Sequence, residues 1–340
     1  PRVALLLDAD WDFRRFVDPT GYPTLLLVDD DLRVRAIDRS NYSEVLAAAA
    51  GGQPSEYLAC STGTIGPQLP MEAITAGIAK AVAGTGSHSS TGTAAALAIM
   101  TTDSVPKEAV IRADGWVVGG MAKGAGMVRP DMATMLGFLT TDADVSAEAL
   151  EEALAIAVDG SFNSLNIDGC ESTNDTVIAM ASGASGTAPD PEVFTEVLTA
   201  VCRDLAMQMA ADAEGASRVV TIDVGGASSD SEARRLGRIV ADSALVRSSF
   251  YGGDVNWGRI VGALGSAESD LDFADITVSY GGVVVFESGE GTAFDEQELL
   301  DRFVDGDMDL AIGLGTGPGT AHIVTTDLTP EYVAFNGERS

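Results

Sequence analysis

The chain has 340 residues, of which 46% are hydrophobic, and a formal net charge of −31. This length and hydrophobic content suit either two domains or one large α/β unit. Such an acidic surface repels phosphate backbones and anionic membranes, so we expect no nucleic-acid or membrane partner. No apolar run reaches the length of a membrane span. The acidity predicts solubility and, as a second interpretation, adaptation to high salt.

Cysteine and histidine usage narrows the chemistry further. Three cysteines lie far apart without a CxxC pair, which argues against disulfides or zinc and favours a cytoplasmic location. The first residues do not read as a secretory signal peptide. Neither histidine, His88 or His322, has an Asp, Cys or His at ligand spacing in the sequence. We therefore expect no metal site and a mechanism that does not depend on histidine.

The first 55 residues read as a strand, a helix, a hairpin and a second helix. The expected strands are 3–7, 25–28 and 32–37, the last two joined by an acidic turn at 29–31, and the expected helices are 11–17 and 40–50. The hairpin and second helix weakly resemble part of a thioredoxin-like domain. Without a CxxC pair, no redox chemistry follows.

From residue 56 onward, strands alternate irregularly with long helices. Helices are expected at 71–83, 93–100, 147–158, 191–214 and 231–243. Strands are expected at 57–60, near 110 and 117, and at 219–224, 276–280, 283–286, 311–315 and 322–326, with a hairpin turn at Gly281-Gly282. Since no βαβ rhythm is present, this order predicts a layered α+β architecture.

A glycine-rich segment, G-G-M-A-K-G-A-G-M-V-R-P-D-M-A-T-M-L, begins at Gly119 and carries Thr134 between two apolar residues. Glycine lets the backbone approach another group closely. The segment also contains Lys123, one of only three lysines in the chain. By itself such a segment is more often a structural turn than a site.

The segment closely resembles the signature of the ornithine acetyltransferases, G-G-M-A-K-G-x-G-M-x-x-P-x-M-A-T-M-L. Other strings resemble the family in the same order: C-S-T-G at 60–63 with L-P-M at 69–71, I-M-T-T-D at 99–103 with P-K at 106–107, D-G at 168–169 with S-T-N-D-T at 172–176, D-A-E-G at 212–215 and N-W-G-R at 256–259. The resemblance covers about residues 57–340, whereas residues 1–55 do not resemble the family.

The resemblance implies a layered α/β/β/α sandwich of a self-cleaving, N-terminal-nucleophile-like acyltransferase. An atypical segment, 1–55, would precede an α-chain portion, 56–133, and a β-chain, 134–340. Cleavage between Ala133 and Thr134 would free an α-amine with a pKa of about 7.7–8.0, able to act as general base for its own hydroxyl. Thr134 would then carry acetyl from N-acetylornithine to glutamate in arginine biosynthesis.

The resemblance also implies roles for other residues. Thr62 through its hydroxyl and Gly63 through its N–H would stabilise the oxyanion. Lys123 would bind a substrate carboxylate and Glu214 a substrate amine. The remaining substrate contacts would be Thr101, Asn336 and Ser340, together with Thr134 itself. No cofactor is implied, although acetyl-CoA stays open as a second donor, and the cleaved chains would form a heterotetramer of two α and two β chains.

Two alternatives belong to other classes. A self-cleaving aminopeptidase or amidase of similar architecture would pass the acyl group to water instead of glutamate. An uncleaved, inactive member of the family would act as a binding protein and would run as one intact chain.

Overall fold

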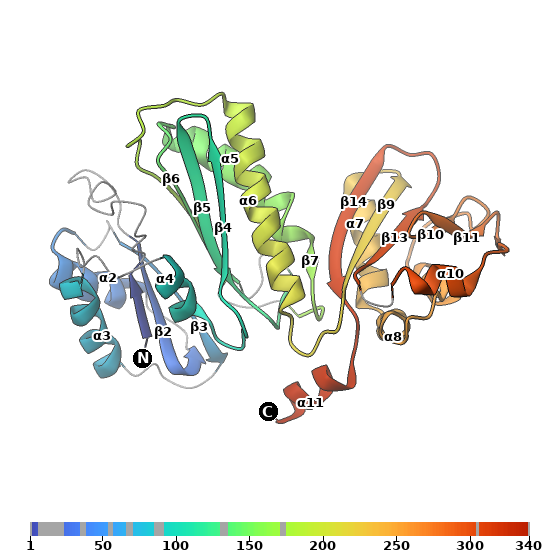
Figure 1. Ribbon diagram of the computed structural model, residues 1–340, viewed down its shortest axis with the longest axis horizontal. Helices are drawn as coiled ribbons and strands as arrows, with labels where there is room; N and C mark the ends of the chain where they lie inside the picture. Colours follow the sequence, from blue (N-terminus) through green and yellow to red (C-terminus); the bar gives the residue numbers. More distant parts are fainter. Residues whose placement is uncertain are drawn as a thin grey trace. The chain divides into compact units, whose positions relative to one another are not determined.

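A computed structural model describes residues 2–5, 24–34, 39–53, 57–65, 71–84, 92–129, 135–170, 175–303 and 306–338 (Figure 1). The chain divides into two compact units. Unit 1 comprises Pro1–Gly124, Asp131–Asn163 and Ser172–Met209, and unit 2 comprises Ala125–Pro130, Ser164–Glu171 and Ala210–Ser340. The glycine-rich segment therefore contributes residues to both units.

The first part of unit 1 contains a three-stranded sheet. Its strands are β1 (Arg2–Leu5), β2 (Thr24–Val34) and β3 (Leu58–Ile65), and its helices are α2 (Arg39–Ala50) and α3 (Met71–Gly84). The strand and helix expected at 3–7 and 40–50 are present with slightly different ends. The helix expected at 11–17 lies outside the described residues.

The hairpin expected at 25–37 is wrong, because β2 runs through the acidic residues as one strand. Both halves of β2 pair in parallel with the same neighbour, β3, with Val28 opposite Thr62 and Arg33 opposite Thr64. The shift of register between these pairs absorbs the extra acidic residues. Local composition predicted a turn, but pairing with a common neighbour keeps the two halves together.

A four-stranded sheet forms the second part of unit 1. Its strand order is β4 (Lys107–Ala113), β5 (Trp116–Lys123), β6 (Leu136–Thr141) and β8 (Thr176–Ala181), with β6 and β8 parallel. The helices of this part are α4 (Gly92–Ile99), α5 (Ala147–Asp159) and α6 (Pro191–Ala211). The sequence predicted β4 and β5 but neither β6 nor β8.

Helices cover both faces of β5, which explains why seven of its eight residues are buried. Gly120 faces α6, where an added Cβ would lie 3.1 Å from a methyl group of Leu205. The next residue, Met121, belongs to a buried cluster with Ile99 of α4. Because successive strand residues point to opposite faces, α4 and α6 pack on opposite sides of the sheet. Figure 1 shows α6 lying along β4 and β5.

Unit 2 is built on a seven-stranded mixed sheet in the order β12-β11-β10-β13-β9-β14-β7. The strands are β7 (Leu165–Asn166), β9 (Val219–Ala227), β10 (Thr277–Tyr280), β11 (Val283–Glu287), β12 (Glu290–Gly291), β13 (Met308–Gly313) and β14 (Gly319–Thr326). The hairpin expected about Gly281-Gly282 is present between β10 and β11. The strands expected at 219–224, 311–315 and 322–326 correspond to β9, β13 and β14.

The helices of unit 2 are α7 (Asp230–Asp242), α8 (Ala244–Gly252), α9 (Trp257–Gly265), α10 (Glu296–Asp301) and α11 (Pro330–Glu338). The first four contribute buried apolar residues to the core that includes this sheet, whereas α11 has no buried residue. Gly237 of α7 lies so close to Val224 and Ile323 that an added Cβ would press on both side chains. Leu236 and Val240 complete this contact inside the main core cluster. In the described part of the chain, no helix is long and apolar enough to cross a membrane.

We predict that Gly226→Ala destabilises unit 2. Gly226 has a φ of +78°, and an added Cβ would overlap the carbonyl oxygen of Gly315. The positive φ alone costs about 1–3 kcal/mol for a residue other than glycine, and the overlap adds to it. The adjacent Gly225 is a matched control, since a Cβ added there would meet nothing within 4 Å. Urea unfolding should show a lower midpoint for Gly226→Ala, and equal midpoints for the two variants would contradict this account.

Candidate active site

The structure brings together two pairs of the predicted site residues, one in each unit. Thr101 and Lys123 meet in unit 1, and Glu214 and Asn336 meet in unit 2. Thr62 and Gly63 lie on β3 of unit 1. Ala133, Thr134 and Ser340 lie outside the described residues.

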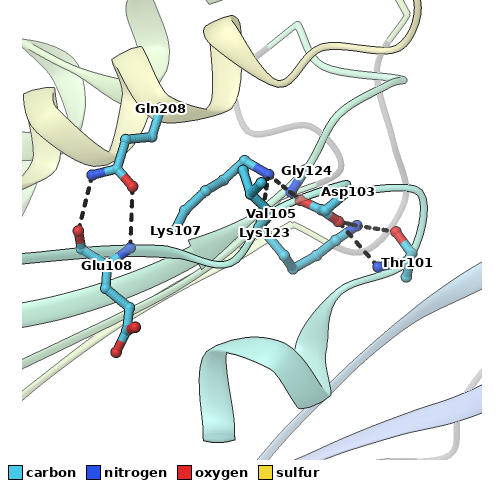
Figure 2. Close-up of polar contacts among 8 residues, drawn as sticks. All are labelled: Thr101, Asp103, Val105, Lys107, Glu108, Lys123, Gly124 and Gln208. Carbon is cyan, nitrogen blue, oxygen red and sulfur yellow. Dashed lines mark hydrogen bonds and ion pairs between the residues drawn. The ribbon is translucent and has the colours of Figure 1, made fainter. Parts of the chain in front are cut away.

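Lys123 is the last residue of β5 and is almost completely buried, with 2% of its surface exposed. Its Nζ donates a hydrogen bond of 2.7 Å to Oγ1 of Thr101, which follows the end of α4 (Figure 2). The packing of α4 against β5 therefore places both residues at the same end of the sheet. A buried ammonium group must be paired or hydrogen-bonded, so this placement requires further partners.

Asp103 supplies the compensating negative charge. Its Oδ1 accepts hydrogen bonds from Nζ of Lys107 at 2.7 Å and from the Gly124 N–H at 2.8 Å, and its Oδ2 accepts one from the Thr101 N–H at 3.0 Å. Nζ of Lys123 lies 4.0 Å from Oδ2. Burial alone would raise the pKa of Asp103, but the two ammonium groups and the Gly124 N–H together lower it below its usual value. Asp103 therefore stays ionised between the two lysines.

Lys107 completes this cluster from the first residue of β4. It is fully buried, and its Nζ also donates to the carbonyl of Val105 at 3.3 Å. The side-chain amide of Gln208 in α6 fastens the adjacent backbone, accepting from the Glu108 N–H at 3.2 Å and donating to the Glu108 carbonyl at 2.9 Å (Figure 2). Two of the chain's three lysines thus share one aspartate, so the buried cluster is formally cationic.

Sequence reasoning quoted Asp103 and Lys107 within a family motif but assigned them no role. The scarcity of lysine was the available signal. This chain has only three lysines, and two of them lie within family strings. That coincidence indicates a cationic site more strongly than it would in a chain with many lysines. Their shared aspartate could not be found from spacing, because Lys123 reaches it only through the packing of β5 beside β4.

Asp168 holds the middle of the glycine-rich segment in unit 2. Its carboxylate accepts hydrogen bonds from the N–H groups of Met127 at 2.6 Å and Val128 at 3.2 Å. The Ile167 N–H donates to the carbonyl of Val128 at 2.7 Å. Met127 has a φ of +55°, a backbone conformation that these contacts hold in place.

Asp175 holds the end of the same segment in unit 1. Its Oδ1 accepts a short hydrogen bond from the Met135 N–H, and the Thr176 N–H donates to the Met135 carbonyl at 3.1 Å. The other oxygen, Oδ2, is buried and has no hydrogen-bond partner among the described residues. Burial raises the pKa of Asp175 to about 7, against the lowering effects of the Met135 N–H and the Lys123 ammonium.

Glu214 and Asn336 form the second pair of predicted residues. Nδ2 of Asn336, in α11, donates to Oε2 of Glu214 at 3.2 Å, and the Glu214 N–H donates to the Ala125 carbonyl at 2.8 Å. The Glu214 carboxylate lies directly over Gly126, where any Cβ would overlap it. This contact explains why the K-G-A-G string has glycine at position 126.

Thr62 is buried on β3, with 3% of its surface exposed, and the nearby Cys60 packs in the cluster that includes α4. Gly63 falls where the pairing of β2 with β3 changes register. Residues at such irregularities commonly have backbone groups released from the strand ladder. The strand expected at 57–60 is longer than predicted: β3 continues through Thr62 and Gly63 to Ile65.

Within the described ranges, no group of three or more His, Cys, Asp or Glu residues could hold a metal ion. His322 on β14 does have an acidic partner that sequence spacing did not show. Its Nδ1 lies 2.7 Å from Oδ1 of Asp223, directly opposite on β9. Both side chains are exposed on the sheet, 49% and 65% respectively, which indicates a surface pair.

Comparison with known proteins decides the family. Residues 36–340 match the ArgJ family. The chain belongs to the ArgJ family. It is 43% identical over 304 residues to the arginine biosynthesis bifunctional protein ArgJ of Thermobifida fusca, covering 89% of this chain and 78% of that protein. It is 45% identical over 286 residues to ArgJ of Mycolicibacterium paratuberculosis, covering 84% and 70% respectively.

A solved structure agrees with this assignment. The crystal structure of the arginine biosynthesis bifunctional protein argJ from Bacillus halodurans is 35% identical and superimposes with a TM-score of 0.58, covering 60% of this chain and 100% of that one. These matches confirm the predicted α+β fold class. They also confirm the prediction that the protein is an acyltransferase of the ornithine acetyltransferase type with a role in arginine biosynthesis. The ArgJ match begins at residue 36, earlier than the limit near residue 57 that the quoted strings indicated.

We predict that Asp103→Asn destabilises the enzyme at neutral pH. The substitution leaves Lys107 and Lys123 buried around a neutral amide, and loss of one member of a buried ion pair costs about 3 kcal/mol or more. Because the folded-state pKa of Asp103 is lowered, its contribution is present above the unfolded pKa of about 4 and is lost as the pH falls through the lower folded value. Urea midpoints of variant and wild type should therefore converge in acid.

A double variant separates lost charge from lost packing. Adding Lys107→Met to Asp103→Asn removes the ammonium group that has lost its Asp103 carboxylate while keeping an extended apolar side chain, so it should recover part of the lost stability. Equal urea midpoints for Asp103→Asn and wild type at pH 7 would show that the cluster does not depend on this charge.

Proposed function

We propose that this enzyme transfers acetyl from N-acetylornithine to glutamate through an acetyl-threonine intermediate, after cleaving its own backbone between Ala133 and Thr134. The observation that carries the proposal is the buried cationic cluster of Lys123, Asp103 and Lys107 at the start of the glycine-rich segment. The same segment ends with Thr134 in the string A-T-M-L. A site for a carboxylate and a nucleophile therefore belong to one continuous stretch of chain.

Self-cleavage would begin with attack of Thr134 Oγ on the carbonyl carbon of Ala133. The peptide C–N bond breaks, the nitrogen takes up the hydroxyl proton, and Ala133 becomes esterified to Oγ. Water then hydrolyses the ester, giving a carboxylate at Ala133 and a free α-amine at Thr134. This α-amine, with a pKa of about 7.7–8.0 in ordinary surroundings, supplies the base that histidine supplies in other acyltransferases.

Acetyl transfer would use the same hydroxyl twice. The α-amine takes the proton of Oγ as Oγ attacks the acetyl carbonyl of N-acetylornithine, and ornithine leaves with that proton. The amine of glutamate then attacks the acetyl ester, forming N-acetylglutamate and returning a proton to Oγ. In each step the developing oxyanion would receive hydrogen bonds from the Thr62 hydroxyl and the Gly63 N–H.

The remaining proposed residues would recognise the amino-acid substrates. The buried ammonium of Lys123, hydrogen-bonded to Thr101, is suited to a substrate carboxylate. The Glu214 carboxylate, held by Asn336, is suited to a substrate amine. Ser340 keeps its proposed role as a further substrate contact.

The proposal needs no metal or other cofactor, and acetyl-CoA is an additional candidate donor. We further propose a cytoplasmic heterotetramer of two α and two β chains. A single intact chain near 35.0 kDa in active material would contradict the cleavage step. Release of free acetate in the presence of excess glutamate would instead favour a hydrolase.

We predict that Thr134→Ala stays uncut and lacks transferase activity, because one hydroxyl performs both reactions. Thr134→Ser should retain both at lower rates, since serine keeps the hydroxyl but loses the methyl group that restricts its rotamer. Intact mass spectrometry should detect a β-chain that begins at residue 134 in wild type and Thr134→Ser only. Full activity in uncut Thr134→Ala would refute the mechanism.

We also predict that Thr62→Ala lowers kcat by about 10²–10³, the usual effect of removing one oxyanion donor. Thr141→Ala is the matched control, because Thr141 is also a buried threonine of unit 1, whose hydroxyl donates to the Val117 carbonyl at 2.8 Å. Steady-state kinetics of the cleaved enzymes should show a loss in kcat for Thr62→Ala that Thr141→Ala does not share. An unchanged kcat would give Thr62 a structural role.

A further inference from the structure

The carboxyl group of Asp175 is largely buried, directly before β8, and is short of partners. Its Oδ1 accepts a hydrogen bond from the Met135 N–H, whereas its Oδ2 has none among the described residues. Burying a carboxylate with an unpaired oxygen is costly, so this oxygen calls for a partner that the continuous chain does not supply among the described residues.

The position of Met135 in the sequence identifies that partner. The Met135 nitrogen belongs to the peptide bond that follows Thr134. Backbone bond lengths keep the α-nitrogen of any residue less than about 4 Å from the nitrogen of the next residue. Since Asp175 is hydrogen-bonded to the Met135 N–H, its carboxyl group lies within roughly 7 Å of the Thr134 α-nitrogen, whatever the conformation of Thr134.

Before cleavage, that α-nitrogen is a neutral amide. After cleavage it becomes an amine that takes up a proton from water to form an ammonium group. Self-cleavage would therefore create a positive charge no more than roughly 7 Å from the carboxyl group, and an opposite charge at about 4–6 Å stabilises the ionised form of its neighbour. Among the described residues of the continuous chain, the only charge that acts on this carboxyl group is that of Lys123, and cutting the chain would add a second positive charge.

Resting on the proposed function, we propose that Asp175 is a positioning residue for Thr134. Oδ1 of Asp175 holds the N–H of Met135, and the charge of Asp175 stabilises the α-ammonium group that cleavage creates at Thr134. Two further observations agree with this role. Burial raises the pKa of Asp175 to about 7 in the continuous chain, as expected for a carboxyl group short of positive charge. The only charged group among the described residues that acts on it is Lys123 of β5, which is already engaged with Thr101 and Asp103.

The direction of the effect on catalysis follows. A carboxylate beside an ammonium group favours the protonated amine, so it raises the pH needed to generate the free base. Asp175→Asn keeps a carbonyl oxygen that accepts the Met135 N–H but removes the charge. It should mature by self-cleavage, and the acidic limb of its kcat/KM profile, where activity rises as the amine loses its proton, should move about one pH unit lower than that of wild type.

The test compares wild type, Asp175→Asn and Asp142→Asn by intact mass and by pH profiles of acetyl transfer. Asp142 is a matched control because its Oδ1 also accepts one backbone N–H, that of Val117 at 2.8 Å, in unit 1. We expect an unchanged profile for Asp142→Asn. Superimposable profiles for Asp175→Asn and wild type would overturn the proposal.

Two further outcomes are decisive. Asp175→Asn that is folded by circular dichroism but remains uncut would show that the charge is needed before cleavage, which overturns the sequence of events proposed here. Asp175→Ala, which loses both the charge and the acceptor, should mature and transfer acetyl at least tenfold more slowly, and wild-type rates would remove its positioning role. Failure of the proposed function is distinct, because wild type itself would then remain uncut or transfer no acetyl.

Discussion

The site depends on the burial of Asp103 between two lysines. Burial alone would raise the pKa of Asp103, and the ammonium groups of Lys107 and Lys123 lower it, so the carboxylate stays ionised inside the protein. The same carboxylate also accepts the Gly124 N–H, which is where the chain leaves β5. One side chain therefore sets both the charge of the site and the path of the glycine-rich segment.

Three aspartates hold the backbone of that segment along its length. Asp103 binds Gly124, Asp168 binds Met127 and Val128, and Asp175 binds Met135. Each belongs to a different family string, and in each case the bond runs from a backbone N–H to a carboxylate. Such bonds fix the backbone without depending on the side chains of the segment, which leaves those side chains available for chemistry. Because Gly126 has no side chain, the Glu214 carboxylate can lie directly against the backbone of the segment.

Secondary structure was predicted accurately where a local sequence pattern determines the element. It was predicted wrongly where the pairing of a strand with its neighbours determines it. The amphipathic helices α5, α6 and α7 and the Gly281-Gly282 hairpin were expected nearly as they are. Strands β6 and β8 were missed, since they follow the glycine-rich and S-T-N-D-T strings and carry no alternating pattern. They are parallel neighbours, each buried or half-buried on both faces, and such strands lack the polar alternation that sequence reading requires. At residues 29–31 the error was a break predicted where none exists, because three consecutive aspartates resemble a turn although they lie inside the continuous strand β2.

The sequence by itself determined the family, the glycine-rich segment, the candidate nucleophile Thr134 and the identities of the candidate substrate residues. It could do so because rare strings in a fixed order carry that information without any geometry. Only the tertiary structure decided that Lys123 shares Asp103 with Lys107, that Gly126 makes room for Glu214, and that Asp175 binds the N–H of Met135, the residue after the candidate nucleophile. These contacts join residues up to 88 positions apart, Gly126 and Glu214 being the most distant. Their energies come from burial and from paired charge, which arise only when distant strands and helices exclude water from a common interior.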